Sequence, residues 1–571
     1  MVDRKELEQL IKSGIIATTP DKDLIDSAIE ELENSGFIRT HNDINNMMFK
    51  NSLTWEVVYE TLLYAERRRF HHLIAMHIER NNKDNLPLVA DLLLHHYEKS
   101  NAFKQCVLYG AMAGDRAAGM YSNQDAVKFY QRALNSIDHI KASHLIDRCL
   151  LREKIGDVFA IAGSDKQAQE SFLLSLGLWR QAPVNKKPLL VPWVFKKTTK
   201  ESALCRKIAI SCERQANFDL SLEWLEKAIE LMPARPGRVA AQVYASKSVS
   251  LSRKGDYRQA IEWGEKALKV ARRSGEASDV AYANNMLANS FIETGNIRKA
   301  IVFLKNSVAT YQENNNLSGI ASASSNLGSC FGMLCDMDSA VKYFNIALDN
   351  DNRMQNESNI AIDHQNLGNV YLIIGQYDPA IKHFESVLIS HECREDLQGA
   401  VLIGLCQCYL GKGEIRKAEK NINKAIKLLN ETGQSALITE AELELAELRL
   451  CQGKPKEAIS ICKISLVKIQ KQNAAYHEVK AERVLGVAYK DINNPDQAVV
   501  HLDNSIKISH DIGMIYDEAR AILIKSRLQL DKNISSKKDV FKEIKYANEI
   551  FNRLNSKSYY DEGRQLLNYY K

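Results

Sequence analysis

The sequence predicts an all-α protein in which about ten helix–turn–helix units of roughly 40 residues stack into a right-handed superhelix, preceded by a small winged-helix-like segment. Three observations support this prediction. The segment Asn326–Phe344 recurs with closely similar residues at Asn366–Phe384. An alternating pattern, typical of short strands, is confined to residues 36–50. An alanine also recurs at spacings of 40, 40, 40, 38, 40 and 40, at Ala260, Ala300, Ala340, Ala380, Ala418, Ala458 and Ala498.

Each unit combines small and large residues at fixed positions. A glycine such as Gly328 or Gly368 is followed by an aromatic residue three positions later, then by the recurring alanine and a second aromatic residue. Small residues allow two helices to cross closely, and large ones fill the space beside them. The pattern resembles the tetratricopeptide repeat, with room for roughly one extra turn per helix relative to the common 34-residue unit. The same frame fits upstream units that contain Ala126, Ala168 and Ser221.

The predicted domains follow from where this frame begins, breaks and ends. Between Ala168 and Ser221 the period lengthens to 53 residues, and the excess contains Pro183, Pro188 and Pro192. Proline blocks helix continuation, so this stretch is predicted to be an insertion or hinge. The predicted division is as follows: 1–52, a winged-helix-like segment, which the resemblance described below implies is the tail of an NTPase module; 53–100, linking amphipathic helices; 101–180, first repeats; 181–200, Pro-rich insertion or hinge; 201–512, main array; 513–571, degenerate repeat and capping helices.

The N-terminal residues do not fit the repeat. Residues 21–35 have helical spacing and end at Gly36, and two short strands around a turn near Asn42 follow. This order of elements is typical of the end of a winged helix. One long amphipathic helix is predicted next, from about Leu53 to Arg80.

Four segments carry a more specific resemblance: Phe49–Leu63, Arg68–Ala75, Leu94–Tyr97 and Tyr109–Ala117. They resemble the region after the ATPase core in soluble-type class III adenylate or guanylate cyclases, over roughly residues 22–140. Those proteins carry a cyclase region, a signalling AAA-like NTPase and tetratricopeptide repeats, in that order. The resemblance implies that the chain is the C-terminal part of such a protein, or a stand-alone descendant.

The sequence departs from that family in two respects. Asn51 stands where the family often has histidine, and the chain contains no Gly-x-x-x-x-Gly-Lys-Ser/Thr phosphate loop and no βαβ alternation. The cyclase and NTPase cores are therefore expected to be absent from this chain.

Composition indicates a soluble protein, with 45% hydrophobic and 26% charged residues. No apolar run approaches the roughly 18 residues that span a bilayer, and the first residues lack the apolar core of a signal peptide. We expect a cytoplasmic protein without a membrane partner. The net charge of +5 is mild, and the densest basic stretch, Arg67–Arg69, is interpreted as a helix face, so no nucleic-acid partner is expected.

No residue pattern indicates catalysis. The eleven cysteines form no Cys-x-x-Cys pair, and Cys406 and Cys408 point to different faces of a helix, so buried reduced thiols are expected. Histidines such as His71 and His95 have no metal-ligand spacing. We therefore predict no catalytic residue, no cofactor and no metal, and expect that the chain is not an enzyme.

The repeat frame places candidate binding residues on the first helix of each unit, which lines the concave face in tetratricopeptide arrays. Amide and hydroxyl side chains bond both donors and acceptors, so they match an extended peptide backbone. The alternative is ordinary solvated surface. The positions three before and one after the glycine-equivalent are Asn285, Asn289, Ser325, Ser329, Gln365, Asn369 and Gln407.

Two further surfaces are candidates for partner binding. The Pro-rich insertion is a possible docking loop through Trp193, Phe195, Lys196 and Lys197, or else a segment packed on the edge of the array. A later first helix carries Glu440, Glu442, Glu444 and Glu447, an acidic patch that favours a basic partner or is simply solvated.

The sequence thus favours a non-catalytic interaction and regulatory module, which binds a protein or peptide partner, or an NTPase or cyclase module in the same or another chain. The alternative is a C-terminal fragment of a multidomain cyclase or NTPase whose catalytic parts lie elsewhere. A transcription activator would need a DNA-reading helix-turn-helix, which is not visible at either end.

Overall fold

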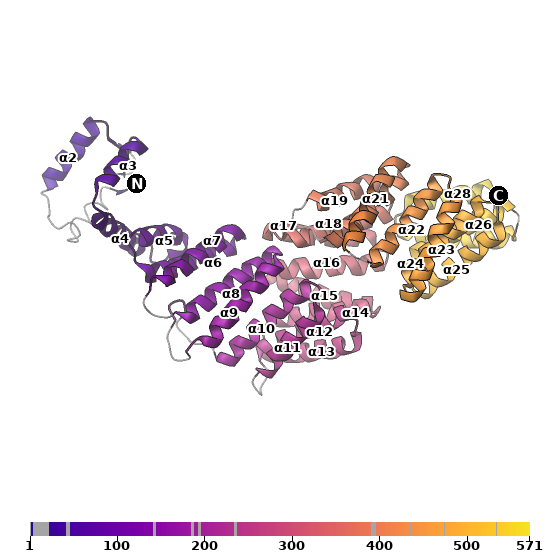
Figure 1. The fold of residues 1–571 in the computed structure, drawn as a ribbon, viewed down its shortest axis with the longest axis horizontal. Helices are drawn as coiled ribbons and strands as arrows, with labels where there is room; N and C mark the ends of the chain where they lie inside the picture. Colours follow the sequence, from indigo (N-terminus) through magenta and orange to yellow (C-terminus); the bar gives the residue numbers. More distant parts are fainter. Residues whose placement is uncertain are drawn as a thin grey trace. The chain divides into compact units, whose positions relative to one another are not determined.

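The computed structural model describes residues 2–3, 22–41, 46–140, 144–183, 188–191, 196–232, 237–389, 395–432, 435–472, 474–532 and 534–570. The chain divides into two compact units (Figure 1). Unit 1 comprises residues 1–160 and 164–233, and unit 2 comprises residues 161–163 and 234–571. Among the described helices, none is long and apolar enough to cross a membrane.

A small sheet begins unit 1. Strands β2 (Ile38–His41) and β3 (Asn46–Phe49) follow helix α2 (Lys22–Asn34), as the alternating pattern predicts. They pair antiparallel, and β1 (Val2–Asp3) adds to the other edge of β3, which the sequence did not lead us to expect. The predicted turn near Asn42 lies outside the described residues.

The single helix expected from about Leu53 to Arg80 is wrong, because the chain breaks it into α3 (Ser52–Thr61) and α4 (Tyr64–Asn81). Leu63 is extended, with ψ of 145°, and the Glu66 carboxylate accepts a hydrogen bond from its N–H at 3.1 Å. This contact satisfies a donor at the start of α4 and so favours a new helix there.

The rest of unit 1 is a series of helices, each packed against its neighbours in sequence (Figure 1). They are η1 (Leu86–Leu88), α5 (Ala90–Lys99), α6 (Phe103–Gly119), α7 (Asn123–Asp138), α8 (Leu145–Ala162), α9 (Asp165–Gln181), α10 (Lys197–Arg214) and α11 (Phe218–Glu230).

Part of the Pro-rich insertion packs back onto α8. The N–H groups of Leu189 and Leu190 donate to Oδ1 of Asp147, at 2.8 and 2.9 Å. Asp147 is fully buried, so these bonds also satisfy its carboxylate.

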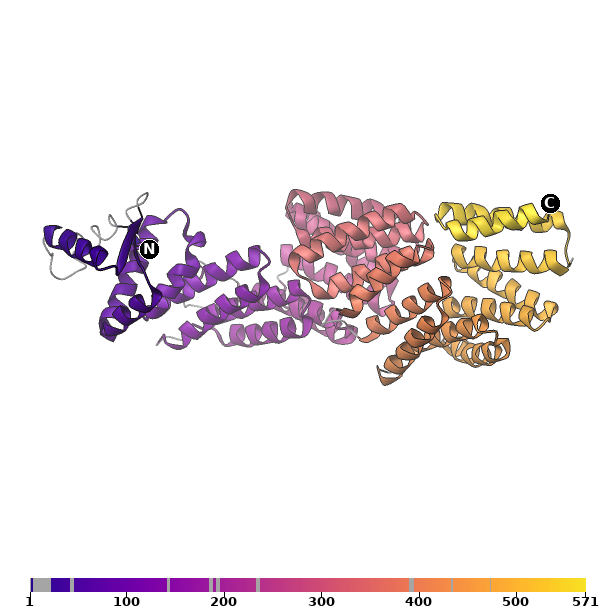
Figure 2. The ribbon, with the colours of Figure 1, turned by 90° about the horizontal axis from the view of Figure 1, so that it is seen from above.

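Unit 2 is itself an array of helices, and Figure 2, coloured along the sequence, shows successive helices side by side. We name the first helix of a unit an inner helix and the second an outer helix. The inner helices are α12 (Arg238–Lys254), α14 (Ala277–Glu293), α16 (Leu317–Met333), α18 (Glu357–Ile373), α20 (Glu395–Gly411), α22 (Ser435–Cys451), α24 (Ala475–Asp491), α26 (Ile515–Lys532) and α28 (Lys557–Tyr569). The outer helices are α13 (Tyr257–Ser274), α15 (Ile297–Glu313), α17 (Met337–Met354), α19 (Tyr377–Ile389), α21 (Ile415–Thr432), α23 (Pro455–Gln472), α25 (Pro495–Asp511) and α27 (Lys537–Arg553).

The recurring alanines lie where inner and outer helices cross, and all seven from Ala260 to Ala498 are fully buried. A Cβ on Gly328 or Gly368 would come within 2.7 or 2.5 Å of the ring of Phe344 or Phe384, the aromatic residue of the paired outer helix. The predicted roles of these small and large residues are therefore confirmed. The predicted all-helical array of stacked helix pairs is confirmed as well.

The turn between the two helices of a unit repeats with the same period. Its left-handed residue is Gly255, Gly295, Cys335, Gly375, Gly413, Gly453 or Asn493, with φ between 60° and 93°. Glycine and asparagine tolerate this conformation best, which explains their prevalence there.

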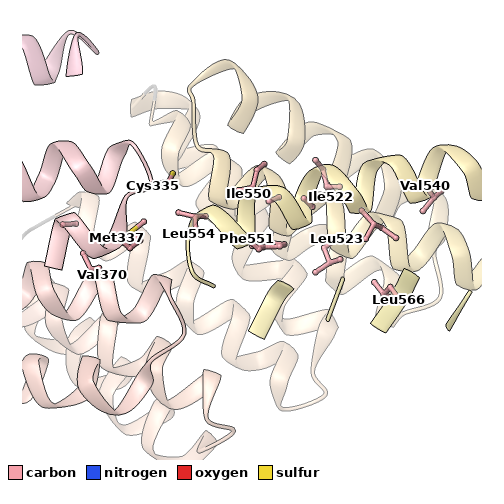
Figure 3. Packing of buried hydrophobic residues seen from close by; sticks show 14 of the residues in the cluster. Cys335, Met337, Val370, Ile522, Leu523, Val540, Ile550, Phe551, Leu554 and Leu566 are labelled. Atoms are coloured by element: carbon pink, nitrogen blue, oxygen red, sulfur yellow. The ribbon is translucent and has the colours of Figure 1, made fainter. Parts of the chain in front are cut away.

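One buried cluster joins segments of unit 2 that are far apart in sequence (Figure 3). It contains Met337 and Val370 from α17 and α18, and Phe551 and Leu554 from the C-terminal end of the chain. Beside it, Asn555 Nδ2 donates to the carboxylate of Asp338 at 3.2 Å, across 217 residues of chain. A stack in which each unit contacts only its neighbours would not bring these two segments together.

Candidate binding face on the inner helices

Polar side chains link the inner helices of unit 2 from one to the next. Asn285 on α14 donates to Ser322 Oγ and accepts from Asn326 Nδ2, both on α16 and both at 3.1 Å. Ser325 on α16 donates to Asp363 Oδ1 on α18 at 3.2 Å. The series of inner helices is therefore tied together by hydrogen bonds on the same face that carries the predicted groove.

Three of the predicted groove residues are accessible for a partner. Asn369 is exposed, and Asn289 and Gln365 are half-buried. Among the described residues, no hydrogen bond ties these three amides to another helix. Ser329 is half-buried and donates to the Ser325 carbonyl of its own helix at 3.2 Å.

Three other predicted positions, Asn285, Ser325 and Gln407, bond to the next inner helix of the protein. Asn285 is 1% exposed. The Gln407 amide donates to Glu444 Oε2 on the next inner helix at 2.9 Å. The next inner helix approaches closely enough to bond these side chains.

The acidic residues of α22 are matched by cations from the following helices. Glu444 is buried and bonds to Lys480 on α24. Glu447 accepts from Arg483 at 3.0 Å and from Arg520 on α26 at 3.5 Å. Three residues of the predicted acidic patch, Glu442, Glu444 and Glu447, are therefore paired with cations within the protein, Glu442 through Lys468 at 2.6 Å.

In this cluster, burial and the neighbouring positive charges shift the pKa values of the carboxyl groups in opposite directions. Burial alone would raise the pKa of Glu447, but the positive charges of Arg483 and Arg520 outweigh it and hold that pKa far below its usual range. Burial raises the pKa of the Glu444 carboxyl, despite the attraction of Lys480. Arg520 also lies between the rings of Tyr516 and Tyr559, at 5.5 and 5.4 Å from their centroids.

A cavity of about 250 Å³ opens beside this cluster, between inner helices α22, α24, α26 and α28. The buried Nε atoms of Arg483 and Arg520 have no hydrogen-bond partner in the described structure. The residues that line the cavity include Glu447, Cys451, Arg483, Lys490, Arg520, Arg527 and Glu562.

Arg483 and Glu447 occupy groove positions of the repeat frame, in the two units that follow the last one used to predict the groove. Arg483 stands three residues before Gly486, the position that Asn285, Ser325 and Gln365 occupy in earlier units. Glu447 follows Ala446 as Asn289 follows Ala288. Extension of the frame by two units would have included both residues.

The predicted docking loop is only partly described. Trp193 and Phe195 lie outside the described residues, whereas Lys196 and Lys197 are exposed at the start of α10. Lys197 Nζ donates to the Arg180 carbonyl at 3.1 Å.

In the described part of the chain, no group of three or more His, Cys, Asp or Glu side chains is arranged to hold a metal. Nine of the ten described cysteines are buried, and Cys451 is exposed. Burial raises the pKa of Cys408 to about 12 and that of Cys330 to about 11. The predicted buried thiols are confirmed at these nine positions.

Comparisons with known proteins agree with the repeat pattern. Residues 319–388 and 241–274 match models of the tetratricopeptide repeat. No curated protein sequence matches the chain.

Several solved structures resemble the chain at low identity. A signal-transduction ATPase with a tetratricopeptide-repeat sensor, PH0952 from Pyrococcus horikoshii, is 16% identical with a TM-score of 0.42, over 77% of this chain and 63% of that one. The human IFIT1 dimer with PPP-AAAA is 15% identical with a TM-score of 0.41, over 80% and 93%. BtubC from P. vanneervenii is 20% identical with a TM-score of 0.31, over 42% and 93%.

The two repeat matches, the 40-residue period and the observed helix pairs lead to one conclusion. Residues 241–274 and 319–388 are tetratricopeptide repeats, and they lie in an array of helix pairs that share the same period.

Proposed function

We propose that the chain is a non-catalytic interaction module that binds an extended peptide segment of a partner across the inner helices of unit 2. The observation that carries this proposal is the set of accessible amides of Asn289, Gln365 and Asn369 on one face. Each amide offers a donor and an acceptor, and an extended backbone presents both in alternation.

The charge cluster supports the same surface. Gln407 and Glu444 connect the row of amides to the cavity beside Glu447, so a peptide that follows the row reaches this cavity. The side chains of Arg483 and Arg520 line this cavity, and their guanidinium groups fit an acceptor group of the peptide there.

The test replaces Asn289, Gln365 and Asn369 together by alanine. Gln407 is left intact because its loss would leave buried Glu444 with one partner fewer. Each lost hydrogen bond is expected to cost about 0.5–1.5 kcal/mol, so the affinity for peptides selected on the wild-type chain should fall at least about tenfold.

The matched control replaces Asn306, Asn345 and Asn423, three exposed asparagines of outer helices, by alanine. It should bind the selected peptides as the wild type does, with equal helicity by circular dichroism. Equal affinity of all three proteins would refute the inner-face site. The loop with Trp193, Phe195, Lys196 and Lys197 would then be tested through Lys196→Glu and Lys197→Glu.

A second proposal concerns a catalytic module of the NTPase or cyclase type, in the same or another chain. Helix α3 is apolar yet has no buried residue, and Trp55, Val57 and Val58 are 50%, 57% and 45% exposed. We propose that such a module covers α3, since exposed apolar helix faces mark interaction sites.

The reading frame upstream of this chain would supply that module. If it encodes a phosphate-loop domain, the purified domain should bind the chain, and Val57→Glu with Val58→Glu should abolish binding. Binding that survives this double change would rule out α3 as the contact. An upstream frame without such a domain would remove the support for a partner in the same chain.

A further inference from the structure

A second cleft, of about 460 Å³, lies on the opposite set of helices of unit 2. Outer helices α13 and α15 form its walls and inner helix α14 its floor. The floor is apolar, because the buried side chains of Leu268, Leu287 and Phe291 line it. The volume lies in the range of about 300–1,000 Å³ typical of ligand pockets.

The rim of this cleft is basic. Lys269, Arg272 and Arg273 of α13 and Lys299 of α15 line it, and Glu265 is the one acid among the described lining side chains. All four cations are exposed. Within the described residues none of them has an ion pair, whereas Arg258 nearby pairs with Glu262 at 3.7 Å.

The sequence of the two outer helices explains this charge. Helices α13 and α15 contain eight basic and three acidic residues, an excess of five that equals the +5 of the whole chain. Positive charge is therefore concentrated on this pair of helices. Concentrated charge of one sign raises the local concentration of an oppositely charged partner.

We propose that this cleft is a second interaction surface, which binds a short acidic segment of a partner protein carrying an apolar anchor residue. The cations complement the acidic side chains, and the apolar floor receives the anchor. The surface is separate from the amides of the inner helices, so it gives the scaffold a second partner.

The floor favours a peptide over a nucleic acid. Binding of single strands relies on exposed aromatic rings on which bases stack. Phe291 is 3% exposed, and Lys299 Nζ lies 4.0 Å from its ring centroid. Its face is therefore covered, and half-buried Phe303 is the one other aromatic ring among the described lining side chains, too few for a series of stacked bases.

The test measures fluorescence anisotropy of a labelled peptide of glutamates around a central Leu-Phe pair, titrated with the full chain. Arg272→Glu combined with Lys299→Glu should weaken binding at least about tenfold. Lys420→Glu with Lys424→Glu on outer helix α21 makes the same change in charge at exposed positions and should leave affinity within about twofold. Replacement of Leu-Phe by Ser-Ser in the peptide should weaken binding.

Three outcomes would overturn the proposal: no binding of the peptide to the wild-type chain, equal loss in both double variants, or equally tight binding of an oligo-deoxythymidine. Helicity by circular dichroism verifies that each variant folds, and Arg272→Gln with Lys299→Gln repeats the test with a milder change. The Asn289, Gln365 and Asn369 triple variant should bind this peptide normally, so failure of one site is distinguishable from failure of the other.

Discussion

Asp363 shows how the close packing of inner helices perturbs a single residue. It is 2% exposed, and its Oδ1 accepts from Ser325 Oγ at 3.2 Å. Burial, and then the negative charge of Asp351, raise its pKa to about 8. An unfolded aspartate releases its proton near pH 4, so the folded state retains a proton that the unfolded chain has lost. The stability that this group contributes is present below about pH 4 and is lost as pH rises toward about 8.

Asp363→Asn should flatten this pH dependence. Asparagine keeps a hydrogen-bonding group and carries no charge to desolvate, so at pH above 8 the variant should be more stable than the wild type by at least about 1.4 kcal/mol, the value of one pKa unit. Urea unfolding at several pH values between 5 and 9 measures the effect. Parallel profiles of the wild type and the variant would contradict it, and exposed Asp349→Asn serves as control.

Within one helix pair, a glycine that faces an aromatic ring fixes the distance at which the two helices cross. Gly368 on α18 has no room for a side chain, because a Cβ there would lie 2.5 Å from the ring of Phe384 on α19. The same pairing, sixteen residues apart, joins Gly114 to Tyr130, Gly156 to Phe172 and Gly328 to Phe344. The pattern in the sequence therefore encodes the distance between two helices.

Gly368→Ala should destabilise the protein by about 1–3 kcal/mol through overpacking, although alanine is the better helix former. The cost should shrink in a Phe384→Leu background, because the smaller side chain leaves space for the methyl group. Chemical denaturation of the two single variants and the double variant gives the coupling. An equal cost of Gly368→Ala in both backgrounds would show that the ring does not set the crossing.

Two further glycines, one in a turn between paired helices and one inside a helix, should respond to alanine with opposite signs. Gly453 has a φ of 72° and open space around its Cβ position, so Gly453→Ala should cost about 1–2 kcal/mol through backbone strain alone. Gly332 lies inside α16, also with open space, and Gly332→Ala should stabilise by about 0.5–1 kcal/mol. Melting temperatures that move in the same direction for both variants would contradict this explanation.

Across unit 2 as a whole, the C-terminal helices add a contact that a linear stack does not have. Stability in a repeat array is normally a sum of terms for single repeats and for neighbouring pairs. Here Met337 and Leu554, at 5% and 0% exposure, belong to one buried cluster (Figure 3), and Arg553 Nη2 donates to the Leu334 carbonyl at 3.4 Å. The two segments should therefore unfold together.

A double-mutant cycle tests this coupling. Met337→Ala and Leu554→Ala should each cost about 2–5 kcal/mol, and the double variant should differ from their sum by about 0.5–3 kcal/mol. The matched pair Leu304→Ala and Leu554→Ala, both fully buried but with Leu304 outside this cluster, should be additive. Additivity in both pairs would mean that the distant segments are energetically independent.

The sequence by itself determined the helix pairs, their period, the buried alanines and the left-handed turns. These features repeat because each depends on local geometry: 3.6 residues per turn, small residues at a crossing, and a φ that glycine tolerates. The burial of the seven recurring alanines, from Ala260 to Ala498, could thus be predicted from the sequence.

Only the tertiary structure decided which polar positions remain open to a partner. Asn285 and Gln407 share the repeat frame with Asn369, yet they bond to the next inner helix, whereas Asn369 is exposed. It also decided that Glu447 is neutralised by Arg483 and Arg520, and that Leu554 meets Met337 across the chain. Burial and pairing depend on how closely neighbouring helices approach and on which distant segments meet. A local pattern of residue types does not specify how closely two neighbouring helices approach, or which distant segments come into contact.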